Sequence, residues 1–131
     1  MGCDIHAHIE LKINGIWHHW SSPDINRDYT LFARLAGVRT NNPKDRRYPI
    51  RPLPEDMTVL TRMVLRRFGN DAHTESFITG DEMTEVANWY ATNIKHPFSR
   101  IFGWGLGNGF SAEGLKEDGV EEARMIFWFD N

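Results

Sequence analysis

Titratable side chains occupy every second position near the start of the chain: Asp4, His6, His8 and Glu10. Successive side chains of a strand point to opposite faces, so these four share one face and the apolar residues between them share the other. Imidazole and carboxylate groups serve as general acids and bases or as metal ligands. The pattern therefore predicts a strand that packs on the core and carries chemistry on its outer face.

A metal site is one alternative for this face. Side chains two positions apart on a strand are separated by roughly 6.5 Å, so His6 and His8 can both reach one ion. Asp4 or Glu10 could add an oxygen ligand, which gives the His–His–carboxylate donor set of zinc hydrolases. This alternative is a hydrolase that uses Asp4, His6 and His8 with a divalent ion such as zinc or manganese. A polar site without metal and a merely solvated strand face are the other two interpretations.

A second polar segment, residues 71–79, supplies groups that suit the site without metal. We expect it to be a loop leading into a capped helix, whose free N–H groups favour an anion. With Asp4 nearby, His6 and His73 could act as general base and general acid on a phosphodiester, and Ser76 could complete the wall. A surface-loop histidine is the other interpretation of His73.

Basic residues are concentrated between positions 39 and 67, where eight of the fifteen Lys and Arg lie beside three acidic residues. Part of this stretch, residues 38–56, carries four prolines and is expected to be an ordered loop without regular structure. Arg39 and Arg51 could hold phosphate oxygens in bidentate fashion. A solvated basic surface is the alternative.

The positioning elements follow from turn and capping signals. Asn14-Gly15 favours a type I′ turn joining strands over 3–13 and 16–21, with Glu10 opposite His19. Helices are predicted over 28–36, ended by Gly37, over 57–68 and over 79–93, the last opened by a Thr79–Glu82 capping box. The second helix is expected to bury Leu60, Met63, Val64 and Phe68.

The remaining segments complete a single α+β domain over residues 1–131. Residues 124–129 are apolar on both faces and predict a central strand. Residues 102–109 hold four glycines and read as a loop around Trp104 and Phe110. The expected fold is a small, mostly antiparallel sheet, built from the N-terminal hairpin and the C-terminal strand, with about three helices packed on one face.

Composition argues against two classes of protein, those that bind nucleic acid polymers and those that span a membrane. The formal charge of −3 argues against a general binder of nucleic acid polymers, and no apolar run reaches the length of a membrane span. One cysteine, Cys3, rules out an internal disulfide, and we expect it to be a buried structural thiol. Without a recognisable signal peptide, the expected location is the cytoplasm.

Several motifs in order resemble a family of small phage and bacterial proteins that begin Gly-Cys-Asp-Ile-His. The resemblance covers roughly residues 1–90 and rests on Gly2-Cys3-Asp4-Ile5-His6 and on residues 26–32, 35–39, 51–56 and 73–79. The family's start does not always keep a histidine at the position of His8, which favours the site without metal. The resemblance implies a site built from Asp4, His6, Arg27, Tyr29, Arg39, Arg51, His73 and Ser76.

These observations lead to one principal hypothesis and two alternatives. The principal hypothesis is a pocket for a phosphorylated, nucleotide-type small molecule, in which Asp4, His6 and His73 do the chemistry and the arginines hold phosphate. The phage context implies, by association, a counter-defence protein that sequesters or cleaves a nucleotide second messenger in the host cytoplasm. Enclosing such a ligand would call for a homo-oligomer. The alternatives are the metal-dependent hydrolase and a non-enzymatic module that binds a protein through the basic loop and the Gly-rich segment.

Overall fold

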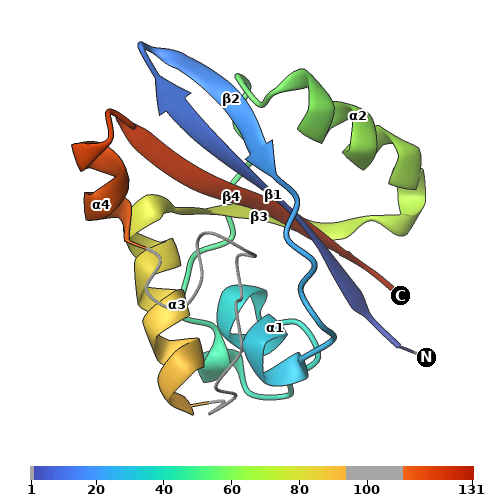
Figure 1. The fold of residues 1–131 in the computed structure, drawn as a ribbon. Helices are drawn as coiled ribbons and strands as arrows, with labels where there is room; N and C mark the ends of the chain where they lie inside the picture. The colour runs from blue at the N-terminus through green and yellow to red at the C-terminus, as the bar shows by residue number, and fades with distance from the viewer. Residues whose placement is uncertain (1, 94–110) are drawn as a thin grey trace.

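The computed structural model describes residues 2–93 and 111–131 and shows an α+β fold. Four antiparallel strands form one sheet in the order β2-β1-β4-β3. Their bounds are β1 Asp4–Ile13, β2 Ile16–Ser21, β3 His73–Thr79 and β4 Glu122–Asp130. Because β1 and β4 pair from Asp4↔Asp130 to Lys12↔Glu122, the two ends of the chain lie side by side at one end of the sheet (Figure 1). The predicted α+β class is confirmed.

The N-terminal hairpin has the predicted register. Asn14 and Gly15 both adopt positive φ (51° and 76°), and Ile13 faces Ile16 across the turn, as a type I′ turn requires. Glu10 lies opposite His19, and a bulge follows where Ile9 pairs with Ser21. The turn therefore decides which histidine of β2 shares a face with His8 and Glu10.

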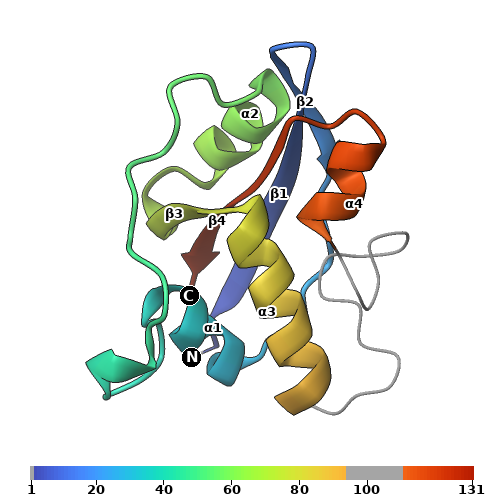
Figure 2. The same cartoon turned by 90° about the vertical axis from the view of Figure 1, so that its left-hand side faces the viewer.

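Helices cover both faces of the sheet (Figures 1 and 2). The helices are α1 Tyr29–Ala36, α2 Val59–Phe68, α3 Gly80–Asn93 and α4 Ala112–Glu117, with 3-10 turns at Pro43–Asp45 and Gly69–Asp71. Helices α1 and α3 pack on the face that holds the main core, whereas α2 lies on the opposite face. The prediction of helices on one face only was therefore wrong. On the titratable face of β1, His8 and Glu10 are buried in a second interior, whereas Asp4 at the start of the strand stays exposed.

The main core joins the apolar side chains of β1 and β4 to those of α1 and α3. Its fully buried members include Ile9, Leu31, Phe32, Met83 and Phe127. Cys3 is fully buried at the edge of this core, as expected for a structural thiol. No helix in the described ranges is long and apolar enough to cross a membrane.

The capping signals at α1 and α3 are confirmed. Asp28 Oδ1 accepts hydrogen bonds from the N–H groups of Thr30 and Leu31, and Gly37 ends α1 in the left-handed conformation. At α3, Glu82 accepts from the N–H of Thr79 at 2.9 Å and donates its own N–H to the Thr79 hydroxyl. These caps stabilise the ends of the two helices that pack on the main core.

Two elements were missed from the sequence. Residues 73–79 form strand β3 instead of a loop, because pairing with the apolar strand β4 overrides their polar composition. Helix α4 follows Ser111, whose hydroxyl accepts from the N–H of Gly114. The Gly-rich loop with Trp104 and Phe110 lies outside the described residues.

Helix α2 is turned differently from the prediction. Leu60 and Met63 are 50% and 40% exposed, whereas Thr61 is fully buried. Thr58 and Thr61 both donate hydroxyl hydrogen bonds to Glu10 in β1. Polar contacts with the buried carboxylate orient the start of this helix, whereas Phe68 at its end packs against His6 and Trp128. Val64 and Phe68, also expected to be buried, are half-buried.

Candidate functional site

Six of the eight residues predicted to form the site lie at the end of the sheet where the termini meet. They are Asp4, His6, Arg27, Tyr29, Arg39 and His73, linked through contacts with each other and with the last two residues of the chain. Their arrangement decides which of the proposed chemistries the fold can support.

Asp4 and Arg27 neutralise each other. Arg27 Nε donates to Asp4 Oδ1 at 3.0 Å and Nη2 donates to Oδ2 at 3.1 Å, in bidentate geometry at the surface. This guanidinium holds the pKa of Asp4 below its usual value. It lies so close to Gly2 that a side chain there would collide with it. The charges of this exposed pair are matched, so it gives a ligand no net charge to bind.

His6 and His73 face opposite sides of the sheet. His6 Nε2 lies 2.8 Å from Asp130 Oδ1, and its ring stacks on Trp128. The His73 ring stacks on Phe129, the next residue of β4. Consecutive strand side chains point in opposite directions, so the sheet separates the two imidazoles. The structure does not bring them together as a general base and general acid on one scissile group.

The three residues of the metal alternative also have separate partners. Asp4 is paired with Arg27, His6 with Asp130, and His8 Nδ1 lies 2.9 Å from His19 Nε2. Burial, and after it the adjacent His19 ring, lowers the pKa of His8 to about 4. Within the described residues, no three His, Cys, Asp or Glu side chains are placed to hold one metal ion.

Glu10 and Arg124 form a buried ion pair on the same face. Arg124 Nε donates to Glu10 Oε1 at 2.9 Å, and both side chains are almost fully buried. Burial raises the pKa of Glu10, but hydrogen bonds from Thr58, Thr61 and Arg124 outweigh it and leave the pKa lowered. The carboxylate is charged and fully occupied, so its role is to fasten α2 to the sheet.

Arg51 and Ser76, also predicted as ligand-binding residues, bind each other away from the six. The N–H of Arg51 donates to Ser76 Oγ at 2.9 Å, and its guanidinium pairs with Glu82 at 2.6 Å. The same guanidinium donates to the carbonyl of Phe77. These bonds fasten the loop to the edge of β3 and leave Arg51 few donors for a phosphate.

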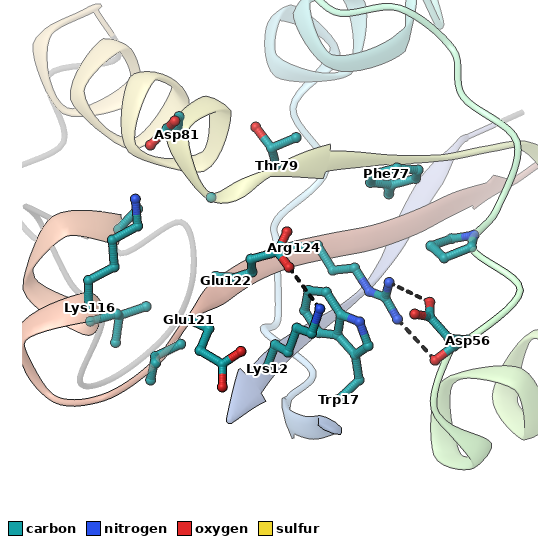
Figure 3. A pocket seen from close by; sticks show the side chains of 16 residues that line it. Lys12, Trp17, Asp56, Phe77, Thr79, Asp81, Lys116, Glu121, Glu122 and Arg124 are labelled. Carbon is teal, nitrogen blue, oxygen red and sulfur yellow. Dashed lines mark hydrogen bonds and ion pairs between the residues drawn. The ribbon is translucent and has the colours of Figure 1, made fainter. Parts of the chain in front are cut away.

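A hollow of about 460 Å³ opens at the hairpin end of the sheet, between β4, α3 and α4 (Figure 3). Arg124 lines it, but this guanidinium is already bound to Glu10 and Asp56 and stacks 3.7 Å from the Trp17 ring. Lys12 is paired with Glu122. With its cations largely matched by carboxylates, this hollow has no marked preference for an anion.

A smaller hollow of about 360 Å³ lies beside α1, between the loop that follows it and α3. The Arg34 guanidinium stands 4.4 Å from the centre of the Trp89 ring, and that of Arg39 stands 5.4 Å from the centre of the Tyr29 ring. The lining also includes Thr30, Ala33, Thr40 and Asp45. The hollow therefore combines two cations with two aromatic rings.

The two arginines of this smaller hollow keep unused donors. Among the residues that the structure describes, Arg34 Nε is buried without a hydrogen-bond partner, while Nη2 forms a long ion pair with Glu85 at 3.8 Å. Arg39 makes a long hydrogen bond, 3.5 Å, to Asn131 and also lies beside the Cys3 thiol. Asp45, the one acidic residue in the lining, accepts a hydrogen bond from the Thr40 hydroxyl. A buried guanidinium N–H without an acceptor is costly. The positive charge of Arg34 and Arg39 favours an anion in the hollow that they line.

Sequence reasoning found Tyr29 and Arg39 but missed Arg34 and Trp89. From the sequence, Arg34 is expected on the exposed face of one helix, and Trp89 is an aromatic residue of another helix 55 positions later. No local spacing joins them. Comparison with protein-family models, with curated proteins and with solved structures returned no match.

Proposed function

We propose that this protein binds a phosphorylated small molecule of nucleotide type in the hollow lined by Tyr29, Arg34, Arg39 and Trp89. The observation that carries the proposal is the pairing of two arginines with two aromatic rings around one hollow, where a guanidinium nitrogen is buried without an acceptor. Arginine donors suit phosphate oxygens, and aromatic faces suit a base.

The size and charge of the hollow favour one nucleotide unit. Its volume of about 360 Å³ is at the lower end of the range for small-molecule sites. The two arginines outweigh Asp45, so the lining carries a net positive charge at neutral pH. Asp45 and Thr40 offer oxygens for ribose hydroxyls, which a bare phosphate would not use.

Binding without cleavage follows from the separation of the two imidazoles. His6 lies on the α2 face of the sheet, while Tyr29 and Arg39 lie on the side of α1. His73 lies on the side of Arg39, where both contact Asn131, but His6 does not, so the predicted acid–base pair does not meet at this hollow. We therefore favour sequestration of the ligand, the first of the two roles proposed from the sequence. His6 then serves the fold through Asp130 and Phe68.

Native mass spectrometry of the untagged protein with AMP, ATP, cyclic AMP and inorganic phosphate tests this proposal. We expect an adduct of one intact nucleotide per chain. Arg39→Gln should weaken it at least about tenfold, since a charge-assisted hydrogen bond contributes about 1.5 kcal/mol or more. Trp89→Leu should weaken nucleotide binding more than phosphate binding.

Arg66→Gln is the matched control, because Arg66 is an exposed arginine on α2, on the opposite face of the sheet. Its affinity should equal that of the wild type. Equal losses in Arg39→Gln and Arg66→Gln would show that binding is non-specific charge attraction. Product masses instead of an adduct would replace sequestration with catalysis, and the absence of any adduct would refute the site.

A further inference from the structure

The two edge strands of the sheet, β2 and β3, differ in how far other parts of the chain cover them. At the β3 edge, the Arg51 loop lies against the strand: the N–H of Arg51 donates to the Ser76 hydroxyl, and its guanidinium donates to the backbone carbonyl of Phe77. A bulge with Thr74 at positive φ also interrupts this edge. Covering loops and bulges are the usual means by which proteins protect an edge strand from pairing. The β3 edge is therefore closed.

The β2 edge is open (Figure 1). Its six residues, Ile16–Ser21, include no Asp, Glu, Lys, Arg or Pro. In the hairpin, Ile16 and His18 direct their backbone groups toward β1, so Trp17 and His19 direct theirs outward. Neither Trp17 nor His19 has a backbone partner on that side among the residues that the structure describes. The open edge therefore presents two N–H and two C=O groups.

The exposed side chains of β2 are apolar or neutral. Ile16 is 60% exposed and Trp20 is 42% exposed, and His18 between them is exposed as well. The start of α2 lies over this edge, because Thr58 bonds to Glu10, the residue opposite His19. Val59 and Leu60, 74% and 50% exposed, add apolar surface on the α2 face of the sheet, opposite the face that carries Ile16, His18 and Trp20. Uncharged, apolar side chains beside an unpaired strand edge favour burial of that edge against another strand.

We propose that β2 pairs with β2 of a second copy of this chain, forming a dimer with a continuous eight-stranded antiparallel sheet. The strand is self-complementary about His18. In that register Trp17 of each copy exchanges both backbone hydrogen bonds with His19 of the other, so all four outward groups of each strand are used. Ile16 then lies beside the other copy's Trp20, and an aromatic with a β-branched residue is a favourable cross-strand pair.

Charge also favours a second copy as the occupant. The strand brings no formal charge to the pairing, so two identical strands meet without like-charge repulsion while their histidines are neutral. The bulge at Trp20 lies beyond the hydrogen-bonding residues and limits the pairing to this short register. A limited register gives a closed pair with two-fold symmetry and not an open fibre.

Disulfide trapping tests both the dimer and its register. In the proposed register His18 lies directly opposite itself, with Cα atoms about 4.5 Å apart, which a disulfide can span. His18→Cys should form a covalent dimer under mild oxidation. Ile16→Cys should not, because the two copies of this position are four residues apart along the strands, roughly 13 Å. The native Cys3 is fully buried.

Sedimentation of the uncrosslinked protein gives the second measurement. The wild type should show a concentration-dependent dimer, and His18→Lys should be a monomer because two ammonium groups would face each other. Ile50→Lys, at a residue 40% exposed in the loop before Arg51, is the matched control and should stay dimeric. A wild type that is monomeric at its highest soluble concentration would overturn the proposal, as would equal crosslinking of Ile16→Cys and His18→Cys.

Discussion

The four titratable residues of β1 share one face, yet each meets a different environment. Asp4 is exposed and paired with Arg27, His6 is half-buried against Asp130, His8 is buried beside His19, and Glu10 is fully buried with Arg124. Strand alternation specifies the shared face but not the partners. The opposing residues of β2 and β4, together with α2 above them, determine whether each group is reactive or structural.

His8 makes stability depend on pH in a definite interval. Its pKa is about 4 in the fold and about 6.5 in a solvated chain. As the pH falls between these values, the unfolded state takes up a proton that the folded state does not, so the free energy of unfolding decreases. The loss is on the order of 3 kcal/mol for a shift of this size and ends once the folded state is also protonated.

We expect His8→Phe to remove this part of the pH dependence, since phenylalanine keeps a ring against Trp128 but cannot titrate. Urea denaturation at a series of pH values across the interval measures it. Arg66→Gln is the control, because Arg66 is exposed on α2 and carries no group that titrates in this interval. Its pH dependence should match the wild type. If the free energy of unfolding of His8→Phe depends on pH as steeply as that of the wild type, a group other than His8 takes up the proton.

At the scale of elements, apolar spacing gave the wrong orientation of α2. Leu60 and Met63 fit an apolar stripe, but the helix turns Thr61 inward and leaves both apolar residues at the surface. The buried pair of Glu10 and Arg124 needs hydroxyl donors, and the residues that supply them must face the sheet. Leaving a buried carboxylate without donors would cost more than exposing two apolar side chains.

Replacing glycine by alanine should have opposite effects in the hairpin turn and in helix α4. Gly15→Ala should lower the free energy of unfolding by about 1 kcal/mol, because Gly15 has φ 76° and an L side chain is strained there. Gly114→Ala, inside α4, should raise it by about 0.5–1 kcal/mol, since the added methyl group meets only ordinary contacts. Thermal or urea unfolding of both variants measures these shifts. Equal signs would contradict the turn geometry.

At the scale of the whole molecule, one sheet has a closed edge and an open edge. Arg51 is central to the closed edge because it joins the Pro-rich loop, Phe77 of β3 and Glu82 of α3. The sequence suggested that this arginine holds phosphate. Its bonds in the fold support a structural role, and in the function proposed above phosphate contacts are assigned to Arg34 and Arg39 instead.

Arg51→Ala should lower the free energy of unfolding by about 1–3 kcal/mol, because the Phe77 carbonyl and the half-buried Glu82 carboxylate lose this donor. It should also uncover the β3 edge and produce assemblies larger than the dimer in sedimentation. Arg66→Ala, at an exposed position of α2, should change stability by less than about 0.5 kcal/mol. Loss of nucleotide binding by Arg51→Ala in chains that remain folded would restore the ligand-binding role predicted from the sequence.

The sequence by itself determined the local features of this protein. The Asn14-Gly15 turn sets the hairpin register, Asp28 and Thr79 cap their helices, and alternation sets the two faces of β1. Each depends on residues within a few positions of one another, where backbone preferences and short-range hydrogen bonds are decisive.

Only the tertiary structure decided which distant groups meet. It made residues 73–79 a strand, placed α2 on the titratable face, and separated His6 from His73 across β4. It also brought Trp89 against Arg34, a contact that no spacing of residues in the sequence predicts. Burial and long-range hydrogen bonding depend on how the complete chain packs. The distant partners of a short segment therefore cannot be predicted from the residues of that segment alone.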